Sequence, residues 1–164
     1  MKILIFTEGT ILMHKNAVGH SRDEIVEQVK NKDESVHEYG SYVPIGNATQ
    51  KIKSWQDQGV EIFYLTSRRK EKEIEEIKDA LEKYNFPEGR VLYRKGDQEY
   101  KNVAEQLIPD IIIEDDCESI GGVNQMTYTN IQPDFKNRIK LISIKEFGGI
   151  DYLPDNLEDL LGLY

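Results

Sequence analysis

Acidic and hydroxyl side chains follow several apolar stretches of this chain, at points where a buried strand would end. The groups are Glu8-Gly9-Thr10, Thr66-Ser67 and Glu114-Asp115-Asp116. Gly9 lets the backbone approach a ligand closely, and the N–H groups of a Gly-Thr turn can bind an anion. Three carboxylates in a row repel one another unless a cation or hydrogen-bond donors compensate their charge. These residues indicate a site for an anion and a hard cation.

Apolar patterning predicts the elements that position these groups. Residues 3–6 are apolar without alternation, and a second buried strand is expected over 110–113, where three isoleucines follow Asp110. Both patterns are typical of strands buried on both faces of a parallel sheet. Further strands are expected at 60–65, 90–94 and 140–144, and helices after the capping box Ser21–Glu24 and over 47–58, 68–84, 97–107 and 155–163. This alternation predicts an α/β fold with a doubly wound parallel sheet, whose ligands bind beyond the carboxyl ends of the strands.

Length and composition limit the number of domains, the kinds of partner and the cellular location that the chain can have. At 164 residues the chain fits a single domain over 1–164, in which residues 13–46 form at most a small cap-like insertion. The net charge of −9 argues against nucleic acid or an anionic membrane surface as a partner. Cys117 is the only cysteine, so an intrachain disulfide is excluded and a cytoplasmic location is expected. The sequence contains no run typical of a signal peptide or a membrane span.

Three histidines, His14, His20 and His37, lie within the 13–46 segment. A metal site is one interpretation of such a group. None of them has the i, i+4 spacing with an acidic partner that would make this interpretation specific. Histidines at the surface or at the edge of the core are the favoured interpretation.

The first polar group resembles the first motif of the haloacid dehalogenase (HAD) superfamily of phosphohydrolases, an apolar strand followed by Asp-x-Asp-Gly-Thr-Leu/Ile. Residues 8–11, Glu-Gly-Thr-Ile, match the second half of that motif. Phe6 stands at the position of the nucleophilic aspartate, and Glu8 stands at that of the second aspartate. The resemblance implies that Glu8 is the catalytic candidate and that Gly9 and Thr10 contribute to phosphate binding.

The second polar group is similar to the second motif of that superfamily. In that motif a strand ends in a threonine or serine whose hydroxyl holds a phosphate oxygen, which implies this role for Thr66 and Ser67. A helix N-cap is the alternative interpretation of Thr66.

The third and fourth motifs also have counterparts. Lys101 matches the lysine that screens charge near the phosphate, with Lys95 as the less favoured candidate; a solvated lysine is the plain alternative. The stretch Ile111–Asp116 resembles the acidic fourth motif, which implies Mg²⁺ ligands at Glu114, Asp115 and Asp116. We therefore predict that Glu8, Thr66, Lys101 and Asp115 converge at the carboxyl edge of one sheet, with the first strand at its centre.

Phe6 decides between the functions that the resemblance allows. Phosphoryl transfer in this superfamily passes through an aspartyl phosphate, and a phenyl ring can neither attack phosphorus nor bind a metal. The favoured hypothesis is a degenerate phosphohydrolase homologue that retains a pocket for phosphate or a small phosphorylated molecule and binds Mg²⁺ weakly. The alternative is an active Mg²⁺-dependent phosphohydrolase with Glu8 as an altered nucleophile. A receiver-like signalling domain is disfavoured, because the strand over 90–94 ends in no aspartate.

Overall fold

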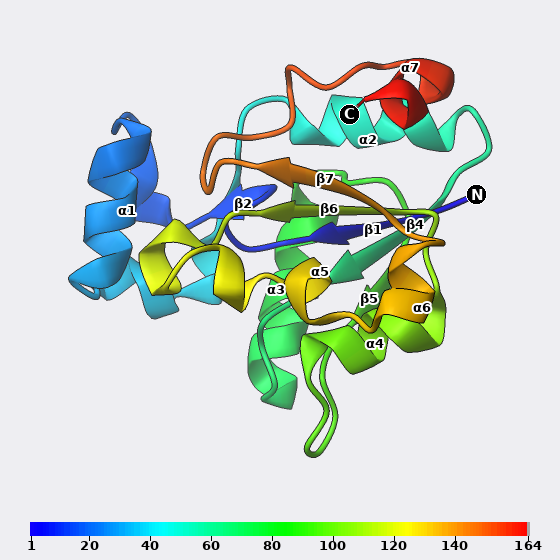
Figure 1. Cartoon of the computed structure of the whole chain (residues 1–164). Helices are drawn as coiled ribbons and strands as arrows, with labels where there is room; N and C mark the ends of the chain where they lie inside the picture. The colour runs from blue at the N-terminus through cyan, green and yellow to red at the C-terminus, as the bar shows by residue number, and fades with distance from the viewer. Residues whose placement is uncertain (164) are drawn as a thin grey trace.

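A five-stranded parallel sheet forms the centre of the computed structural model, which describes residues 1–163 (Figure 1). Its strands are β1 Lys2–Phe6, β4 Glu61–Leu65, β5 Arg90–Leu92, β6 Ile111–Asp115 and β7 Lys140–Ile144. The order across the sheet is β5-β4-β1-β6-β7, and every neighbouring pair is parallel. β1 is therefore the central strand, as the sequence predicted.

The strand order reverses beside β1. The chain runs from β1 to β4 and β5 on one side, and then crosses to β6 and β7 on the other side. This is the doubly wound arrangement expected from the alternation of strands and helices. The carboxyl ends of β1, β4 and β6 flank the reversal point, which is where open α/β sheets bind ligands.

Helices cover both faces of the sheet (Figure 1). The α-helices within residues 1–163 are α1 Arg22–Lys30, α2 Ala48–Gln56, α3 Glu71–Lys83, α4 Tyr100–Leu107, α5 Thr127–Asn130, α6 Pro133–Lys136 and α7 Leu157–Gly162, of which all but α1 lie over the sheet. Side chains of α2, α3 and α7 pack in one buried cluster, and those of α4 in a second cluster on the opposite face. Among the helices described for residues 1–163, none has both the length and the apolar character needed to cross a bilayer.

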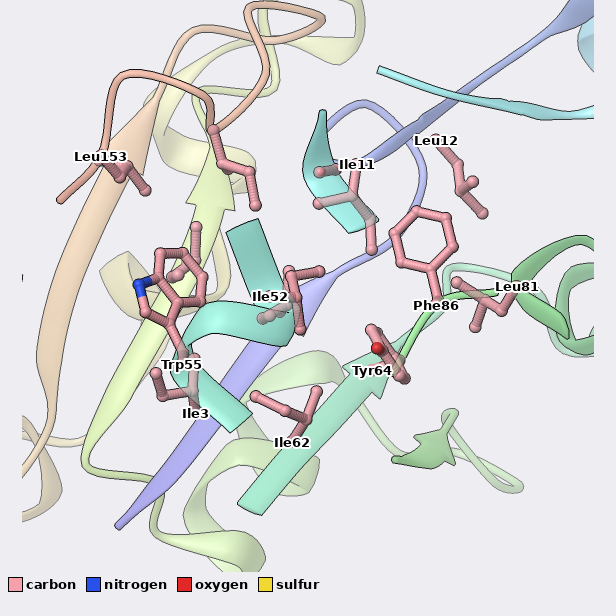
Figure 2. Packing of buried hydrophobic residues seen from close by; sticks show 14 of the residues in the cluster. Ile3, Ile11, Leu12, Ile52, Trp55, Ile62, Tyr64, Leu81, Phe86 and Leu153 are labelled. Atoms are coloured by element: carbon pink, nitrogen blue, oxygen red, sulfur yellow. The ribbon is translucent and has the colours of Figure 1, made fainter. Parts of the chain in front are cut away.

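The two buried clusters explain why the apolar residues of β1 do not alternate with polar ones. Ile3 and Ile5 point to one face, where they share a cluster with Trp55 of α2 (Figure 2). Leu4 points to the other face and shares a cluster with Val103 of α4. All three β1 side chains are fully buried. Burial on both faces therefore requires an apolar residue at every position, and each such side chain contributes about 1.5–3 kcal/mol.

The segment 13–46 lies at the carboxyl ends of the strands, where Figure 1 places α1 beyond the arrowheads of β1, β6 and β7. The short strands β2 Leu12–Met13 and β3 Val43–Pro44 pair antiparallel and close its base. Between them lie α1 and the 3-10 helices η1 Lys15–Ala17, η2 Glu34–His37 and η3 Tyr39–Ser41. The predicted capping box at the start of α1 is confirmed.

Some element boundaries differ from those predicted. α3 begins at Glu71 rather than at Arg68, because residues 67–70 form a loop in which Ser67 and Arg68 contact Glu8. α4 begins at Tyr100, three residues later than expected at the earliest. The four-residue helices α5 and α6 were not predicted, because one helical turn carries too little periodicity to detect.

Candidate functional site

The turn after β1 places Glu8 at the carboxyl edge of the sheet. The N–H of Leu12 donates to the Thr7 carbonyl and the N–H of Gly9 donates to the Leu12 carbonyl, each at 2.9 Å. Gly9 has a φ of +84°, and a Cβ at this position would lie 3.0 Å from Oδ2 of Asp115. The turn therefore requires glycine. The expectation that the Gly9 N–H is free for an anion is wrong, because the turn itself uses that N–H.

The Glu8 carboxylate is surrounded by donors from the end of β4. Its Oε1 accepts hydrogen bonds from Thr66 Oγ1 at 2.7 Å and from Ser67 Oγ at 3.1 Å, and its Oε2 accepts from the Ser67 N–H at 3.3 Å. The guanidinium Nε of Arg68 lies 3.4 Å from Oε1. The hydroxyl groups that the resemblance assigns to phosphate thus serve Glu8 in this structure, and Thr66 is fully buried.

Arg68 joins the sheet edge to the 13–46 segment. Its guanidinium lies over the Tyr39 ring, 4.4 Å from the ring centroid, and also donates a hydrogen bond to the Tyr39 hydroxyl. Two further hydrogen bonds, from Nε at 3.1 Å and from Nη2 at 2.7 Å, reach Ser67 Oγ. This side chain is therefore positioned by a cation–π contact and by hydrogen bonds to both parts of the molecule.

Arg94 follows β5 and approaches the same site from the other side of Ser67. Its guanidinium stacks on Tyr100 at 3.9 Å from the ring centroid and donates to the Ser67 carbonyl at 3.2 Å. Burial lowers the pKa of Arg94, and the nearby Arg69 and Arg68 lower it further. Its Nε is buried and has no hydrogen-bond partner within the described part of the chain.

Phe6 supplies an apolar wall where the resemblance expects a nucleophile. It is the last residue of β1, and its ring meets Tyr100 edge to face, with the centroids 5.5 Å apart. Tyr100 in turn carries the Arg94 guanidinium. Phe6 therefore packs against the Tyr100 ring, on which the Arg94 guanidinium stacks.

Asp115 ends β6 and is buried below the turn after β1. Its Oδ2 accepts a hydrogen bond from Thr10 Oγ1 at 2.8 Å, and its Oδ1 accepts from the Cys117 N–H at 3.0 Å. Burial raises the pKa of Asp115, and the two hydrogen bonds act in the opposite direction. Thr10, predicted to bind phosphate, is fully buried and donates its hydroxyl to Asp115.

The other two acidic residues of the predicted metal group point to different partners. Glu114 accepts the N–H groups of Thr127 and Tyr128 at the start of α5, both at 2.8 Å, and burial raises its pKa to about 7. Asp116 pairs with Lys145 at 2.9 Å. Burial disfavours its charge, but Lys145, the Glu146 N–H and Arg22 together outweigh burial and lower the pKa of Asp116. The structure therefore does not direct these three carboxylates to one point.

The residues present do not fit a complete Mg²⁺ site. Magnesium requires near-octahedral oxygen ligands. Phe6 places a phenyl ring at one expected ligand position, and the oxygens of Glu8 and Asp115 already accept hydrogen bonds. Within residues 1–163, no group of three histidine, cysteine or acidic side chains is placed to hold a metal ion.

Lys101 does not join the other predicted residues. Its ammonium group pairs with Glu99 at 2.8 Å, because both lie at the exposed start of α4, and it does not line the cavity described below. Arg68 and Arg94 supply the positive charge instead. Arg68 could have been predicted as a site residue, because it directly follows Thr66-Ser67. It was missed because a helix was expected to begin at residue 68.

A cavity of about 310 Å³ lies at this edge of the sheet. Residues at the carboxyl ends of the strands and just beyond them line one side of the cavity, and residues of the 13–46 segment line the other side. The strand-end side includes Phe6, Glu8, Gly9, Ser67, Arg68, Arg94, Glu114 and Asp115, and the segment side includes His14, Val36, His37, Tyr39 and Tyr42. The 13–46 segment therefore walls the cavity, as a small cap would.

The three histidines have different surroundings. His14 is 1% exposed and lines the cavity, and His37 is exposed at its rim with Nδ1 3.3 Å from the Tyr39 hydroxyl. His20 lies outside the cavity, with Nδ1 3.6 Å from Glu24, four residues further on. The statement that no histidine has an acidic partner at i, i+4 is therefore wrong for His20. They do not come together as a metal site. A further acidic residue that the sequence did not single out, Glu146, lines the cavity and accepts two hydrogen bonds from Ser119.

Solved structures show what this arrangement is similar to. The tungstate-bound class C acid phosphatase from Bacillus anthracis has a TM-score of 0.57 and 14% identity, over 96% of this chain and 75% of that chain. Another structure of that phosphatase gives 0.55 and 13% over the same shares. A chain of the Pnkp1/Rnl/Hen1 complex gives 0.55 and 12%, over 88% of this chain and 46% of that chain.

These likenesses and the strand order show that the chain has a HAD-like fold, a doubly wound α/β architecture. At such low identity they establish the fold alone. No protein-family model and no curated protein sequence matches the chain.

Proposed function

We propose that this chain is a catalytically degenerate homologue of HAD phosphohydrolases, whose cavity binds a small phosphorylated molecule without hydrolysing it. The observation that carries this proposal is Arg94. Its Nε–H is buried without a partner, and within residues 1–163 the guanidinium forms no ion pair with a carboxylate. A buried donor without a partner costs about 1–3 kcal/mol, and more when it is charged. A bound anion removes this cost.

A second cation strengthens the case for an anionic ligand. Arg68 and Arg94 both donate to Ser67, one to its hydroxyl and the other to its carbonyl. Their like charges repel, and Glu8 compensates Arg68 only. One guanidinium group can donate two parallel hydrogen bonds to two oxygens of a phosphate. A tetrahedral oxyanion between Arg68 and Arg94 could accept such bonds from both. The tungstate bound to the class C acid phosphatase is an oxyanion of that shape.

The absence of turnover follows from Phe6 and Glu8. A phenyl ring cannot form the covalent phosphoryl intermediate. An attacking carboxylate needs a free lone pair, whereas both Glu8 oxygens accept hydrogen bonds and Arg68 lies 3.4 Å away. Any Mg²⁺ binding through Asp115 is then weak, because that carboxylate must first give up the Thr10 and Cys117 donors.

Calorimetric titration with inorganic phosphate and with an alkyl phosphate tests the proposal. We expect Arg94→Gln to weaken the binding of both at least about ten-fold, since a hydrogen bond to a charged group contributes about 1.5–3 kcal/mol. Arg90→Gln is the matched control, because Arg90 begins the strand that Arg94 follows, is exposed and does not line the cavity. Equal affinities of the two variants would refute the assigned role of Arg94.

An active phosphohydrolase with Glu8 as the nucleophile is the second candidate. The observation in its favour is that Glu8 lines the same cavity as both arginines. It predicts Mg²⁺-dependent hydrolysis of p-nitrophenyl phosphate that is abolished in Glu8→Gln. We expect no such turnover from the parent protein.

A further inference from the structure

The cavity concentrates polar atoms that lack partners. Within residues 1–163 the buried side-chain atoms without a hydrogen-bond partner are His14 Nε2, Gln28 Oε1, Arg94 Nε and Thr127 Oγ1. All except Gln28 belong to residues that line the cavity. Buried polar groups are nearly always paired, so such a concentration points to a ligand that supplies the missing partners.

The hydrogen bonds of Ser35 determine which ring nitrogen of His14 carries the proton. The Ser35 hydroxyl has one hydrogen and two neighbouring acceptors, Asp33 Oδ1 at 3.1 Å and His14 Nδ1 at 2.7 Å. Hydrogen bonds, led by that of the Ser35 N–H, lower the pKa of Asp33, so its carboxylate is charged and is the stronger acceptor. The hydroxyl hydrogen therefore goes to Asp33, and Nδ1–H donates to Ser35 Oγ.

This assignment leaves Nε2 as a neutral acceptor. Burial lowers the pKa of His14, which keeps the ring uncharged near neutral pH. Ser35 and Asp33 do not line the cavity, so the Nδ1 edge of the ring faces away from it and the Nε2 edge faces toward it. An unpaired acceptor at this wall needs a hydrogen-bond donor from the ligand.

We infer that His14 Nε2 selects ligands that carry a hydroxyl or amino group in addition to their phosphate. The inference rests on the proposed function, which assigns the phosphate to Arg68 and Arg94, and it adds a second point of recognition on the 13–46 segment. The cavity volume of about 310 Å³ lies at the lower end of small-molecule sites. The ligand class is therefore a small phosphate ester bearing a hydroxyl or amino group.

Two matched series of esters test this selection by calorimetry. Alkyl phosphates of two to six carbons are compared with ω-hydroxyalkyl phosphates of the same lengths. At the best length we expect the hydroxyl group to tighten binding to the parent protein about ten-fold, which corresponds to ~1.4 kcal/mol. In His14→Phe this preference should disappear while the alkyl phosphates still bind.

His37→Phe is the control, because His37 also lines the cavity but is exposed and has the Tyr39 hydroxyl within reach. It should keep the preference for the hydroxyl group. A preference that is absent from the parent at every chain length, or that survives in His14→Phe, overturns the inference while leaving the proposed function standing. If neither phosphate nor any ester binds, the proposed function fails and the inference fails with it.

Nitrogen NMR of the parent protein gives a test that needs no variant. The imidazole ¹⁵N shifts should identify His14 as the Nδ1–H tautomer with an unprotonated Nε2. Addition of the best hydroxyalkyl phosphate should shift the Nε2 resonance, whereas the alkyl phosphate of equal length should not. A ring protonated at Nε2 in the free protein would overturn the assignment.

Discussion

The Glu8 carboxylate lies where several donors from the end of β4 meet, and this arrangement limits what it can do. Thr66 and Ser67 direct hydrogen bonds at its oxygens, and Arg68 compensates its charge. The Glu8 carboxylate thus occupies the hydroxyl donors that the resemblance assigns to a bound phosphate. A ligand phosphate must then depend on Arg94 or displace Glu8, which explains why Arg94 carries our proposal.

Gly9 provides the first prediction at the scale of single residues. Gly9→Ala should lower the free energy of unfolding by about 1–3 kcal/mol, because a side chain is strained at a φ of +84° and its Cβ would press on Asp115. Gly19→Ala is the control, since Gly19 has a φ of +82° but no atom within 4 Å of its Cβ position. Chemical denaturation should show the larger loss for Gly9→Ala; equal losses would mean that the contact with Asp115 contributes nothing.

His14 provides a prediction on pH. Burial is the main cause of its lowered pKa, and His20 adds to it, while Asp33 acts in the opposite direction. Below the unfolded-state pKa of about 6.5 the unfolded chain therefore binds more protons at this residue than the folded chain does. The stability that neutral His14 contributes is complete above that pH and is lost as the pH falls toward the lower, folded-state pKa.

The measurement compares the parent with His14→Gln, which does not titrate. Urea unfolding between pH 5 and 8 should show the parent losing stability relative to the variant below pH 6.5, by at most about 1.4 kcal/mol per pH unit. A stability difference that stays constant across this range would show that His14 has the same pKa in both states.

At the scale of elements, the carboxyl end of β1 carries the third prediction. Phe6→Asp should lower the free energy of unfolding by about 3 kcal/mol, because a carboxylate replaces a ring that packs on Tyr100. Phe6→Leu keeps an apolar side chain and should cost about 1 kcal/mol. Thermal unfolding with and without Mg²⁺ should show stabilisation of Phe6→Asp only, because only that variant gains a ligand near Asp115. A gain in Phe6→Leu as well would indicate a metal site elsewhere.

The elements with the clearest apolar patterns are those that the sequence predicted best. β1, β4, β6 and β7 lie within one or two residues of their expected ranges, because each is a short run rich in apolar residues. The one-turn helices α5 and α6 and the β2–β3 pair were missed, because elements this short are defined by tertiary contacts rather than by periodicity.

Sequence reasoning about the site succeeded for position and failed for contacts. The carboxyl ends of parallel strands must meet, so the placement of Glu8 and Asp115 beside one cavity followed from the sheet alone. The direction of a long side chain depends on its neighbours in space, which no local pattern records. Lys101 accordingly pairs with Glu99, while Arg94 enters the cavity by stacking on Tyr100.

At the scale of the whole molecule, the 13–46 segment and the sheet edge are joined through Arg68 and Tyr39. Tyr39→Leu should loosen this junction, because it removes both the cation–π contact and the hydroxyl acceptor of the guanidinium. Hydrogen–deuterium exchange should become about ten-fold faster in the 13–46 segment, in line with a cation–π energy of about 0.5–2 kcal/mol. Amides of β1 and β6 should keep their protection.

Tyr152→Leu is the control for this prediction, since the Tyr152 side chain is 67% exposed and does not line the cavity. Unchanged exchange in the 13–46 segment of Tyr39→Leu would show that the β2–β3 pair and the 3-10 helices hold the segment without the Arg68 contact. Faster exchange throughout the chain would instead indicate a loss of global stability.

Trp55 is the only tryptophan of the chain, and it lies fully buried in the large core cluster, where its Nε1 donates to the Pro154 carbonyl at 2.9 Å. It does not line the cavity. Its intrinsic fluorescence is therefore an optical probe of whether the α2 face of the sheet stays packed, and it does not respond directly to a molecule in the cavity. Excited at wavelengths that the nine tyrosines do not absorb, this tryptophan reports folding separately from ligand occupancy.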